Sequence, residues 1–101
     1  MDKYIFKSSG NYLGFITNNF IFSRDGVYLG WVDENKYVWD TSGRYKGGLS
    51  TIGEYEYIVR HQYTMSPVPR APKITPPTPA IPPPVPNIPP INLQIGFEDG
   101  F

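Results

Sequence analysis

The sequence lacks several features on which common protein classes depend. It contains no cysteine, which excludes a disulfide scaffold and a thiolate metal site. It has no apolar run of signal-peptide length, and no segment is long enough and free enough of proline and charge to span a bilayer. We therefore expect a cytoplasmic protein with no membrane partner, and secretion by a signal-independent route stays open.

Neither sign of charge is in excess. Nine Lys and Arg balance nine Asp and Glu in the whole chain, and residues 1–65 alone carry seven of each sign. Proteins that bind nucleic acid usually present a basic stripe or patch. No such stripe is present, so nucleic acid is not an expected partner.

Groups for catalysis are equally scarce. His61 is the only histidine, and without cysteine it has no partner for a thiol dyad. Acid–base catalysis and metal binding both need several polar groups that converge on one place. Asp25 and Asp40 lie beside turns, where Asp is favoured for local hydrogen bonding. The sequence therefore predicts no enzyme, no catalytic residue, no cofactor and no metal site.

The chain does contain one short sequence unit that is repeated three times, with copies that begin at Tyr4, Phe20 and Tyr37. Each copy reads aromatic, branched aliphatic, aromatic, three residues rich in Ser and Asp, Gly, any residue, Tyr, any residue, Gly. The first glycine of each copy follows Ser or Asp between two strand-like runs, which is typical of a hairpin loop with a left-handed residue after a type I turn. Each copy is therefore predicted to be a β-hairpin.

The hairpins are predicted to share one register. An aromatic pair lies beside each turn, made by Phe6–Tyr12, Phe22–Tyr28 and Trp39–Tyr45. Continuing the same register places Ile5 opposite Leu13 and Tyr4 opposite Gly14, so that a ring covers bare backbone. Strand alternation gives each hairpin one aromatic and one mostly aliphatic face, and we expect both to be covered.

A last, degenerate hairpin is predicted from residues 49–52 and 55–59, because repeat arrays usually have an atypical terminal unit. Together with the absence of helical periodicity, this predicts an all-β fold of repeated hairpins over residues 1–65.

At Ser66 the composition changes, and all twelve prolines lie between Pro67 and Pro90. Residues 66–101 are therefore predicted to form an extended, proline-rich C-terminal tail.

The tail is predicted to adopt polyproline II, because its prolines recur every three residues and this helix has three residues per turn. Pro76, Pro79 and Pro82 form one set that would line an edge of the helix, and Pro83, Pro86 and Pro89 form a second set. The predicted docking residues are Pro76, Pro79, Pro82, Pro86 and Pro89. An apolar tail is expected to pack on aromatic rings. The candidate receptor rings are Tyr12, Tyr28, Trp31, Trp39 and Tyr45. Twenty-four residues at about 3.1 Å each reach roughly 75 Å, whereas a compact domain of this size is about 28 Å across. The tail must therefore bend around its own domain, reach another subunit or bundle with other tails, and we favour an intermolecular role.

The unit Tyr-Ile-Phe-x-x-x-Gly-x-Tyr-Leu-Gly-(Phe/Trp)-(Ile/Val), the proline-rich stretch 80–91 and the ending Ile-Gly-Phe-Glu-Asp-Gly-Phe together resemble the bacterial 4-fold β-flower proteins. The resemblance covers essentially the whole chain. It implies β-hairpins arranged like petals about a pseudo-fourfold centre. It provides no functional residues to carry over to this sequence, because the family has no established activity.

These observations favour a structural or protein-interaction module whose tail docks on aromatic grooves or mediates self-assembly. The expected partner is a second copy, giving a homo-oligomer, or another protein. A carbohydrate-binding module that uses the same aromatic face is the alternative. A third reading, the tail as a ligand for an adaptor domain of the SH3 type, is disfavoured because Arg70 and Lys73 suit neither common spacing from the proline run.

Overall fold

The computed structural model describes residues 3–53, 55–61, 68–73, 75–77, 81–83, 85–93 and 96–101. All regular structure in these residues is β-strand. The strands are β1 (Lys3–Phe6), β2 (Tyr12–Thr17), β3 (Phe20–Ser23), β4 (Tyr28–Val32), β5 (Tyr37–Asp40), β6 (Tyr45–Ile52), β7 (Tyr55–His61) and β8 (Phe97–Asp99). The all-β fold predicted from the repeat is confirmed.

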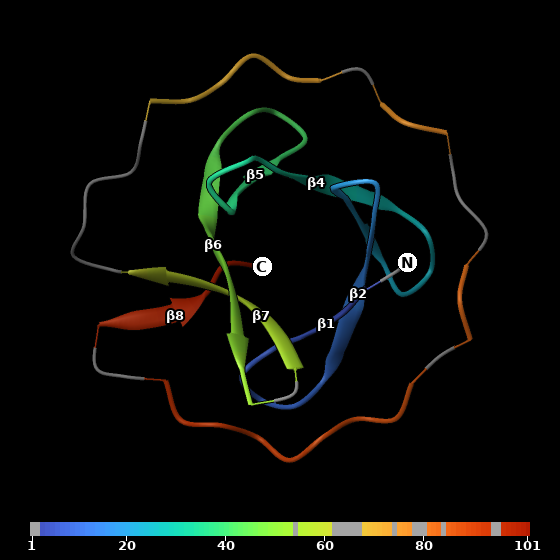
Figure 1. Ribbon diagram of the computed structural model, residues 1–101, viewed down its shortest axis with the longest axis vertical. Coiled ribbons are helices and arrows are strands. Elements are labelled where there is room, and N and C mark those ends of the chain that lie inside the picture. The colour runs from blue at the N-terminus through green and yellow to red at the C-terminus, as the bar shows by residue number, and fades with distance from the viewer. Residues whose placement is uncertain are drawn as a thin grey trace.

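The strands form one sheet that closes on itself. Each strand pairs antiparallel with the next in chain order, and β1 also pairs parallel with β7. Figure 1 shows the resulting ring of strands seen along the shortest axis of the molecule. The molecule is a flattened disc with principal extents of 37 × 34 × 18 Å. The four hairpin-like units that build it are unit 1 (β1 and β2), unit 2 (β3 and β4), unit 3 (β5 and β6) and unit 4 (β7 and β8).

The predicted turns are present at the tips of units 1 to 3. Gly10, Gly26 and Gly43 have φ angles of 89°, 87° and 88°, the left-handed conformation that the loop requires. At each tip the same pair of main-chain hydrogen bonds closes the loop, from Lys7 to Asn11 and from Gly10 to Lys7 in unit 1. The three tips are therefore one structure repeated.

The predicted register is right beside the turns and wrong beyond them. Phe6 pairs with Tyr12 as expected, but Ile5 then pairs with Gly14 and Tyr4 with Phe15. The shift is a β-bulge, in which one extra residue on a strand is left unpaired. The same shift occurs in units 2 and 3. The aliphatic residue, rather than the aromatic ring, therefore faces the glycine in units 1 to 3.

These glycines allow neighbouring units to approach closely. A side chain at Gly14 would collide with the carbonyl oxygen of Phe22 on β3, and one at Gly30 with that of Trp39 on β5. In both cases the obstructing atom is main chain of the next unit, which cannot move aside. The second glycine of the repeat is thus explained by contact between units, and not by an aromatic ring that covers it.

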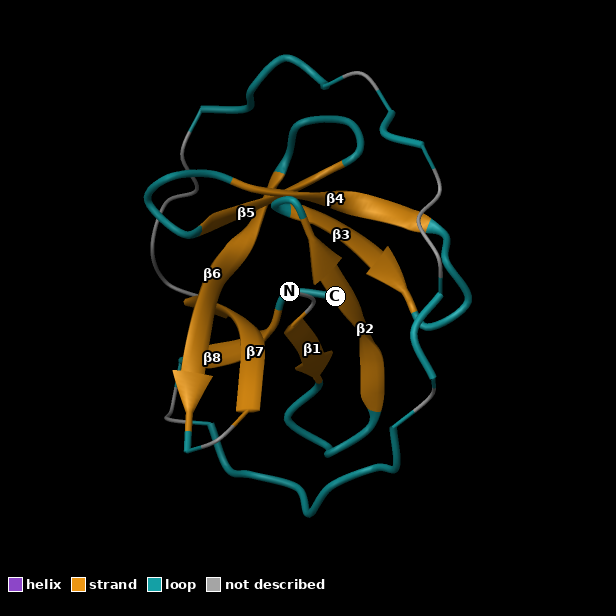
Figure 2. Cartoon of the chain, turned by 45° about the vertical axis from the view of Figure 1, so that its right-hand side comes forward, coloured by secondary structure: helices purple, strands orange, loops and turns teal. Residues whose placement is uncertain are grey.

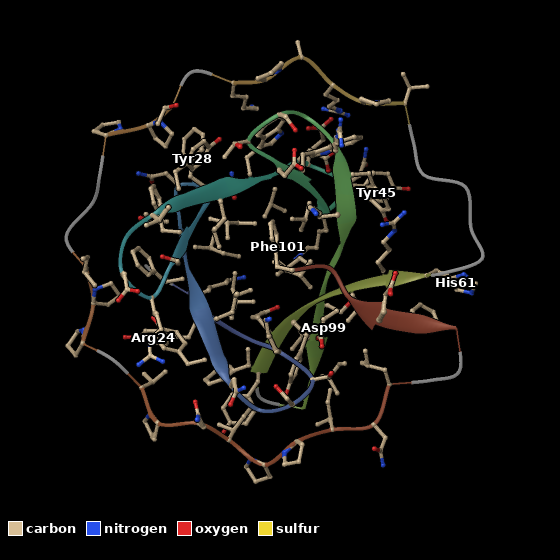
Figure 3. All side chains as sticks on the ribbon, turned by 180° about the vertical axis from the view of Figure 1, so that it is seen from behind. Arg24, Tyr28, Tyr45, His61, Asp99 and Phe101 are labelled. Atoms are coloured by element: carbon tan, nitrogen blue, oxygen red, sulfur yellow. The ribbon has the colours of Figure 1, made fainter. Side chains whose placement is uncertain are left out.

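The aliphatic faces of all four units meet in one core. Its buried members are Ile5, Ile21 and Val38 between the two aromatic residues of each repeat, Ile16 and Val32 near the end of the second strands, and Ile58 on β7. Leu13, Leu29, Leu49 and Phe101 pack around them. Figure 3 shows Phe101 pointing toward the centre of the ring. The prediction that the aliphatic face is covered is confirmed.

The fourth unit differs from the prediction. Residues 49–52 and 55–59 do form a hairpin, but it is the connection between units 3 and 4, equivalent to the β2–β3 connection. Unit 4 itself consists of β7 and the distant strand β8, paired from Val59–Asp99 to His61–Phe97. Gly96 and Gly100 repeat the four-residue spacing of Gly10 and Gly14. The end of the predicted tail is therefore a strand of the sheet.

Between β7 and β8, the residues that the structure describes run around the outside of the disc. We call the described parts of residues 68–93 the belt. Figures 1 and 2 show the belt following the rim, outside the hairpin tips. The belt is extended and forms no strand. Among the residues that the structure describes, no helix has the length and apolar character needed to cross a bilayer.

Candidate functional site

The five candidate receptor rings fall into two groups. Tyr12, Trp31 and Trp39 are almost completely buried, with exposed fractions of 4%, 1% and 1%. Tyr28 and Tyr45 are half-buried, and Figure 3 places both between the ring of strands and the belt. The candidates therefore belong to the body of the fold, and the half-buried tyrosines are the more open of them.

Each tyrosine of the repeat is the centre of an aromatic triad. In unit 1, Tyr12 contacts both Tyr4 and Phe6, with ring centroids 5.9 and 5.8 Å apart. In units 2 and 3 the corresponding rings make the same contacts at 5.7 to 6.0 Å. Edge-to-face and tilted arrangements at these distances are favourable for ring quadrupoles. The triads stabilise the outward, aromatic face of each hairpin.

The belt packs on this aromatic face at units 1 and 4. Phe6, Tyr12 and Tyr57 form a buried cluster. The belt side chains packed against it are Val85, Ile88 and Ile91. Two grooves border the contact. A groove of about 440 Å³ lies between the belt and β1, and one of about 380 Å³ lies between the belt and the β6–β7 hairpin.

The belt is also fastened to the hairpin tips through main-chain atoms. The Ile88 amide donates to the Gly10 carbonyl at 2.9 Å, and the Arg70 amide donates to the Gly43 carbonyl at 2.9 Å. A side chain at either glycine would collide with the carbonyl oxygen of the same belt residue. The two tips therefore hold the belt in the same way, and both require glycine. We call these contacts the tip clamps.

Two further bonds strengthen the attachment at unit 1. The Ile91 amide donates to the Ser8 carbonyl at 2.8 Å, and the Tyr12 amide donates to Asn87 Oδ1 at 3.1 Å. Because Ile88 and Ile91 are three residues apart, both amides reach the same tip in an extended chain with three residues per turn.

At unit 3 the belt is attached by charge. Arg70 Nη2 lies 3.3 Å from Asp33 Oδ2, and its guanidinium lies 5.0 Å from the centroid of the Trp39 ring. The Asp33 side chain is only 2% exposed, whereas that of Arg70 is 44% exposed. Lys73 similarly lies 5.9 Å from the Trp31 ring. Cation–π contacts of this kind contribute about 0.5–1 kcal/mol at exposed sites.

Asp33 is held by several donors at once. Its Oδ1 accepts hydrogen bonds from the amides of Asn35 and Tyr37 at 2.9 and 3.0 Å, and its Oδ2 accepts one from Trp39 Nε1 at 3.0 Å. Burial by itself raises the pKa of Asp33, but these bonds and the Arg70 charge outweigh burial and lower it. The carboxylate is therefore ionised at neutral pH and can pair with the belt.

Burial raises the pKa of the tyrosine hydroxyl of Tyr28, and likewise that of Tyr57. Both side chains are thus neutral at physiological pH.

A smaller cleft of about 260 Å³, lined in part by Asn19, Trp31 and Lys73, lies beside the belt near unit 2. The indole nitrogen of Trp31 is buried and has no hydrogen-bond partner among the described residues.

The described residues offer little that could perform acid–base or metal chemistry. No group of three or more His, Asp or Glu side chains converges among them as a metal site would require. His61 lies at the end of β7, and the centroid of its imidazole is 4.7 Å from that of the Phe97 side-chain ring. Figure 3 shows that His61 lies far from the centre of the ring of strands. Its contacts are those of a residue that joins β7 to β8.

The predicted docking prolines are only partly the residues that make contact. Pro76 and Pro82 are half-buried, Pro86 and Pro89 are exposed, and Pro79 lies outside the described residues. Three aliphatic residues of the same stretch, Val85, Ile88 and Ile91, are the ones that pack against the aromatic cluster. Sequence reasoning missed Gly10, Gly43, Asp33 and Arg70 as attachment points. The recurrence of the tip glycine was visible in the sequence. Nothing in the sequence indicated that the same glycine also contacts another segment of the chain.

Comparison with known proteins gives one finding. A family model described as "4-fold beta flower protein" matches residues 1–94. The match covers the three complete hairpin units and the belt. Nothing among curated proteins or solved structures matches the chain.

Proposed function

Because the chain belongs to the 4-fold beta flower family, for which the name describes a fold alone, we propose that it is a non-enzymatic protein-interaction module. The belt is its docking element, and an aromatic face of the hairpin ring is the receptor. The same contacts serve self-assembly when belt and receptor come from two copies of the chain.

One observation carries this proposal. The belt meets the hairpin ring at two tips through equivalent main-chain bonds, at Gly10 and Gly43, while Val85, Ile88 and Ile91 pack on the aromatic cluster. Main-chain bonds combined with pockets for selected side chains are the usual means by which a protein recognises an extended peptide. The ring therefore has the features of a peptide receptor.

The test compares two sets of belt variants in the full chain. The docking variant carries Val85→Ser, Ile88→Ser and Ile91→Ser, which are half-buried positions. The control carries Val68→Ser and Ile81→Ser, which are 84% and 52% exposed. Each docking substitution is expected to lower the free energy of unfolding by roughly 1 kcal/mol, because about half an aliphatic side chain loses its burial.

Urea unfolding and multi-angle light scattering are the measurements. The docking variant is expected to unfold at lower urea and to show a smaller average mass wherever the parent protein associates. The control is expected to behave as the parent does. Equal unfolding midpoints and equal masses for the two variants would reject the proposal.

The carbohydrate-binding alternative is the weaker one. A stacking ring must be accessible on one face, and Tyr12, Trp31 and Trp39 are at most 4% exposed. Only Tyr28 and Tyr45 among the candidates are partly open. Tryptophan and tyrosine fluorescence recorded across a glycan panel tests this function, and a saturable response that Tyr28→Ala or Tyr45→Ala abolishes would restore it.

A further inference from the structure

Unit 4 is completed by a strand that arrives from far along the sequence. β8 pairs with β7, and the Gly100 amide donates to the Ile58 carbonyl at 3.0 Å. Phe101 packs against the central aliphatic core. The second half of this unit therefore contributes to both the sheet and the core.

β8 also joins unit 4 to unit 1. Asp99 Oδ1 accepts a hydrogen bond from the Ser8 amide at 2.8 Å, and Asp99 Oδ2 accepts one from the Ser8 hydroxyl at 2.7 Å. β1 and β8 lie on the same edge of β7, since β1 pairs at Glu56 and Tyr57 and β8 pairs from Val59 onward. We call the contact of β8 with β7 and with Ser8 at the tip of unit 1 the seam.

The two halves of unit 4 are joined by a very long connection. Residues 62–96 separate β7 from β8, whereas residues 7–11 separate β1 from β2. A hairpin with a short loop must close within its own chain. A connection of 35 residues (62–96) places no such requirement on unit 4.

The connection between β7 and β8 is long enough to reach a second molecule. Thirty-five residues at about 3.1 Å each span roughly 110 Å when extended, about three times the 37 Å extent of the disc. To close the seam in its own chain, the proline-rich connection must instead follow the curved rim (Figure 1). A stiff segment is bent by that path and can run straighter between two molecules.

We propose that β8 and the belt can be exchanged, so that β8 of one chain closes the seam of a second copy. The exchanged and unexchanged forms contain the same seam contacts, which is the condition for domain swapping. This inference rests on the proposed function, because it specifies how belt docking produces self-assembly.

A second copy of this chain is the occupant that the seam fits. β8 needs the free edge of β7, the Ser8 amide and hydroxyl, and a hydrophobic place for Phe101, all of which are described above. Only another copy presents these three features together with the belt-binding tips. The exchange would therefore give closed dimers, or open chains of molecules if the partner's β8 passes to a third copy.

The cysteine-free sequence allows a direct test in the full-length protein. One variant carries Ser8→Cys and a second carries Asp99→Cys. Neither can form this disulfide within its own chain, so a bond between Ser8→Cys and Asp99→Cys in a mixed sample joins two molecules, and a yield above random collision places β8 of one molecule on the unit 1 tip of another. A mixture of Asp99→Cys with Ser42→Cys, an exposed position at the tip of unit 3, measures random collision.

The variants are mixed, partly unfolded and refolded together, oxidised, and analysed by non-reducing electrophoresis. The expected result is a covalent heterodimer for the Ser8 and Asp99 pair at several times the level of the Ser42 control. A level equal to the control overturns the exchange. It leaves the proposed function standing if the docking variants described above still unfold at lower urea than their control.

A second measurement keeps the seam contacts intact and therefore does not depend on the cysteine variants. Deleting residues 75–83 shortens the belt between its two tip clamps, so that it no longer spans the rim of its own disc. We expect light scattering to show at least a twofold rise in mass, because β8 then reaches only a second copy. The control replaces the same nine residues with Gly and Ser at equal length. A folded, monomeric deletion variant would also overturn the exchange.

Discussion

The indole nitrogen of Trp39 donates a hydrogen bond to the carboxylate of Asp33, 3.0 Å away and six residues earlier in the chain. The donor lies on β5 and the acceptor in the turn that precedes it. This bond fixes a nearly buried carboxylate in the position from which it pairs with Arg70 of the belt. One residue thus connects the turn, the hairpin face and the belt.

Replacing Asp33 should destabilise the protein. In Asp33→Asn, the side-chain amide cannot satisfy Trp39 Nε1 and both turn amides as the carboxylate does, and the charge that attracts Arg70 is lost. We expect the free energy of unfolding to fall by about 2 kcal/mol, the range for hydrogen bonds to charged groups. Urea unfolding measures this. Asp25→Asn, at an exposed position, serves as the control and should change little.

The acid dependence of stability should trace to Asp33 and Asp40. Burial raises the pKa of each, but hydrogen bonds outweigh it and lower the pKa in the folded state. The unfolded chain then binds protons more readily, so stability is present above about pH 4, the ordinary Asp range, and is lost as the pH falls through the lowered values. Thermal unfolding between pH 2 and 6 should show this loss, and Asp33→Asn should make the profile shallower. A profile identical to the parent's would contradict the assignment to Asp33.

Tip glycines should be more sensitive to substitution than their backbone angle alone requires. Gly10→Ala and Gly43→Ala place a methyl group against the belt carbonyls, in addition to the cost of a left-handed φ, which is about 1–2 kcal/mol. Gly53 also has a positive φ of 63° but nothing lies within 4 Å of an added Cβ, so Gly53→Ala measures the backbone cost alone.

We expect both tip variants to unfold at lower urea than Gly53→Ala and to expose the belt to proteolysis. Equal destabilisation of all three variants would mean that the tip clamps do not hold the belt in solution.

Parts of this structure follow directly from the residues. The turns were predictable because Gly10 and its counterparts recur after Ser or Asp between strand-like runs, and the aromatic pairs beside them follow from the loop length. The aliphatic core was predictable from strand alternation. These features depend on neighbours within a few residues, which a repeat displays three times over.

Other parts depend on contacts that the sequence does not display locally. The β-bulge was missed because the sequence around Leu13 and Gly14 fits a bulged strand pairing as well as a regular one. β8 was missed because three residues and a Gly-x-x-x-Gly spacing are a weak signal beside a proline-rich stretch. The attachment of Arg70 to Asp33 joins two segments that no repeat relates.

Removing the aromatic ring of Phe101 should weaken the core. Phe101 is half-buried and packs against the aliphatic cluster, with Lys46 Nζ 5.6 Å from its ring centroid. Phe101→Ala is therefore expected to cost about 2 kcal/mol, somewhat less than the full cost of truncating a buried Phe. Differential scanning calorimetry measures the change. Val27→Ala, at a tip position 62% exposed, should stay close to the parent.

The seam between Ser8 and Asp99 sets an order of events during folding. Its two partners are 91 residues apart, whereas the bonds that form the hairpin tips join residues three or four apart. Closing a long loop is entropically costly and slow compared with forming a local turn. We expect β1 to β7 to assemble rapidly into an open, C-shaped sheet, whose free β1 and β7 edges pair or are capped only later. During that interval the molecule exposes a sheet edge, so its tendency to aggregate should depend on how fast the last strand arrives.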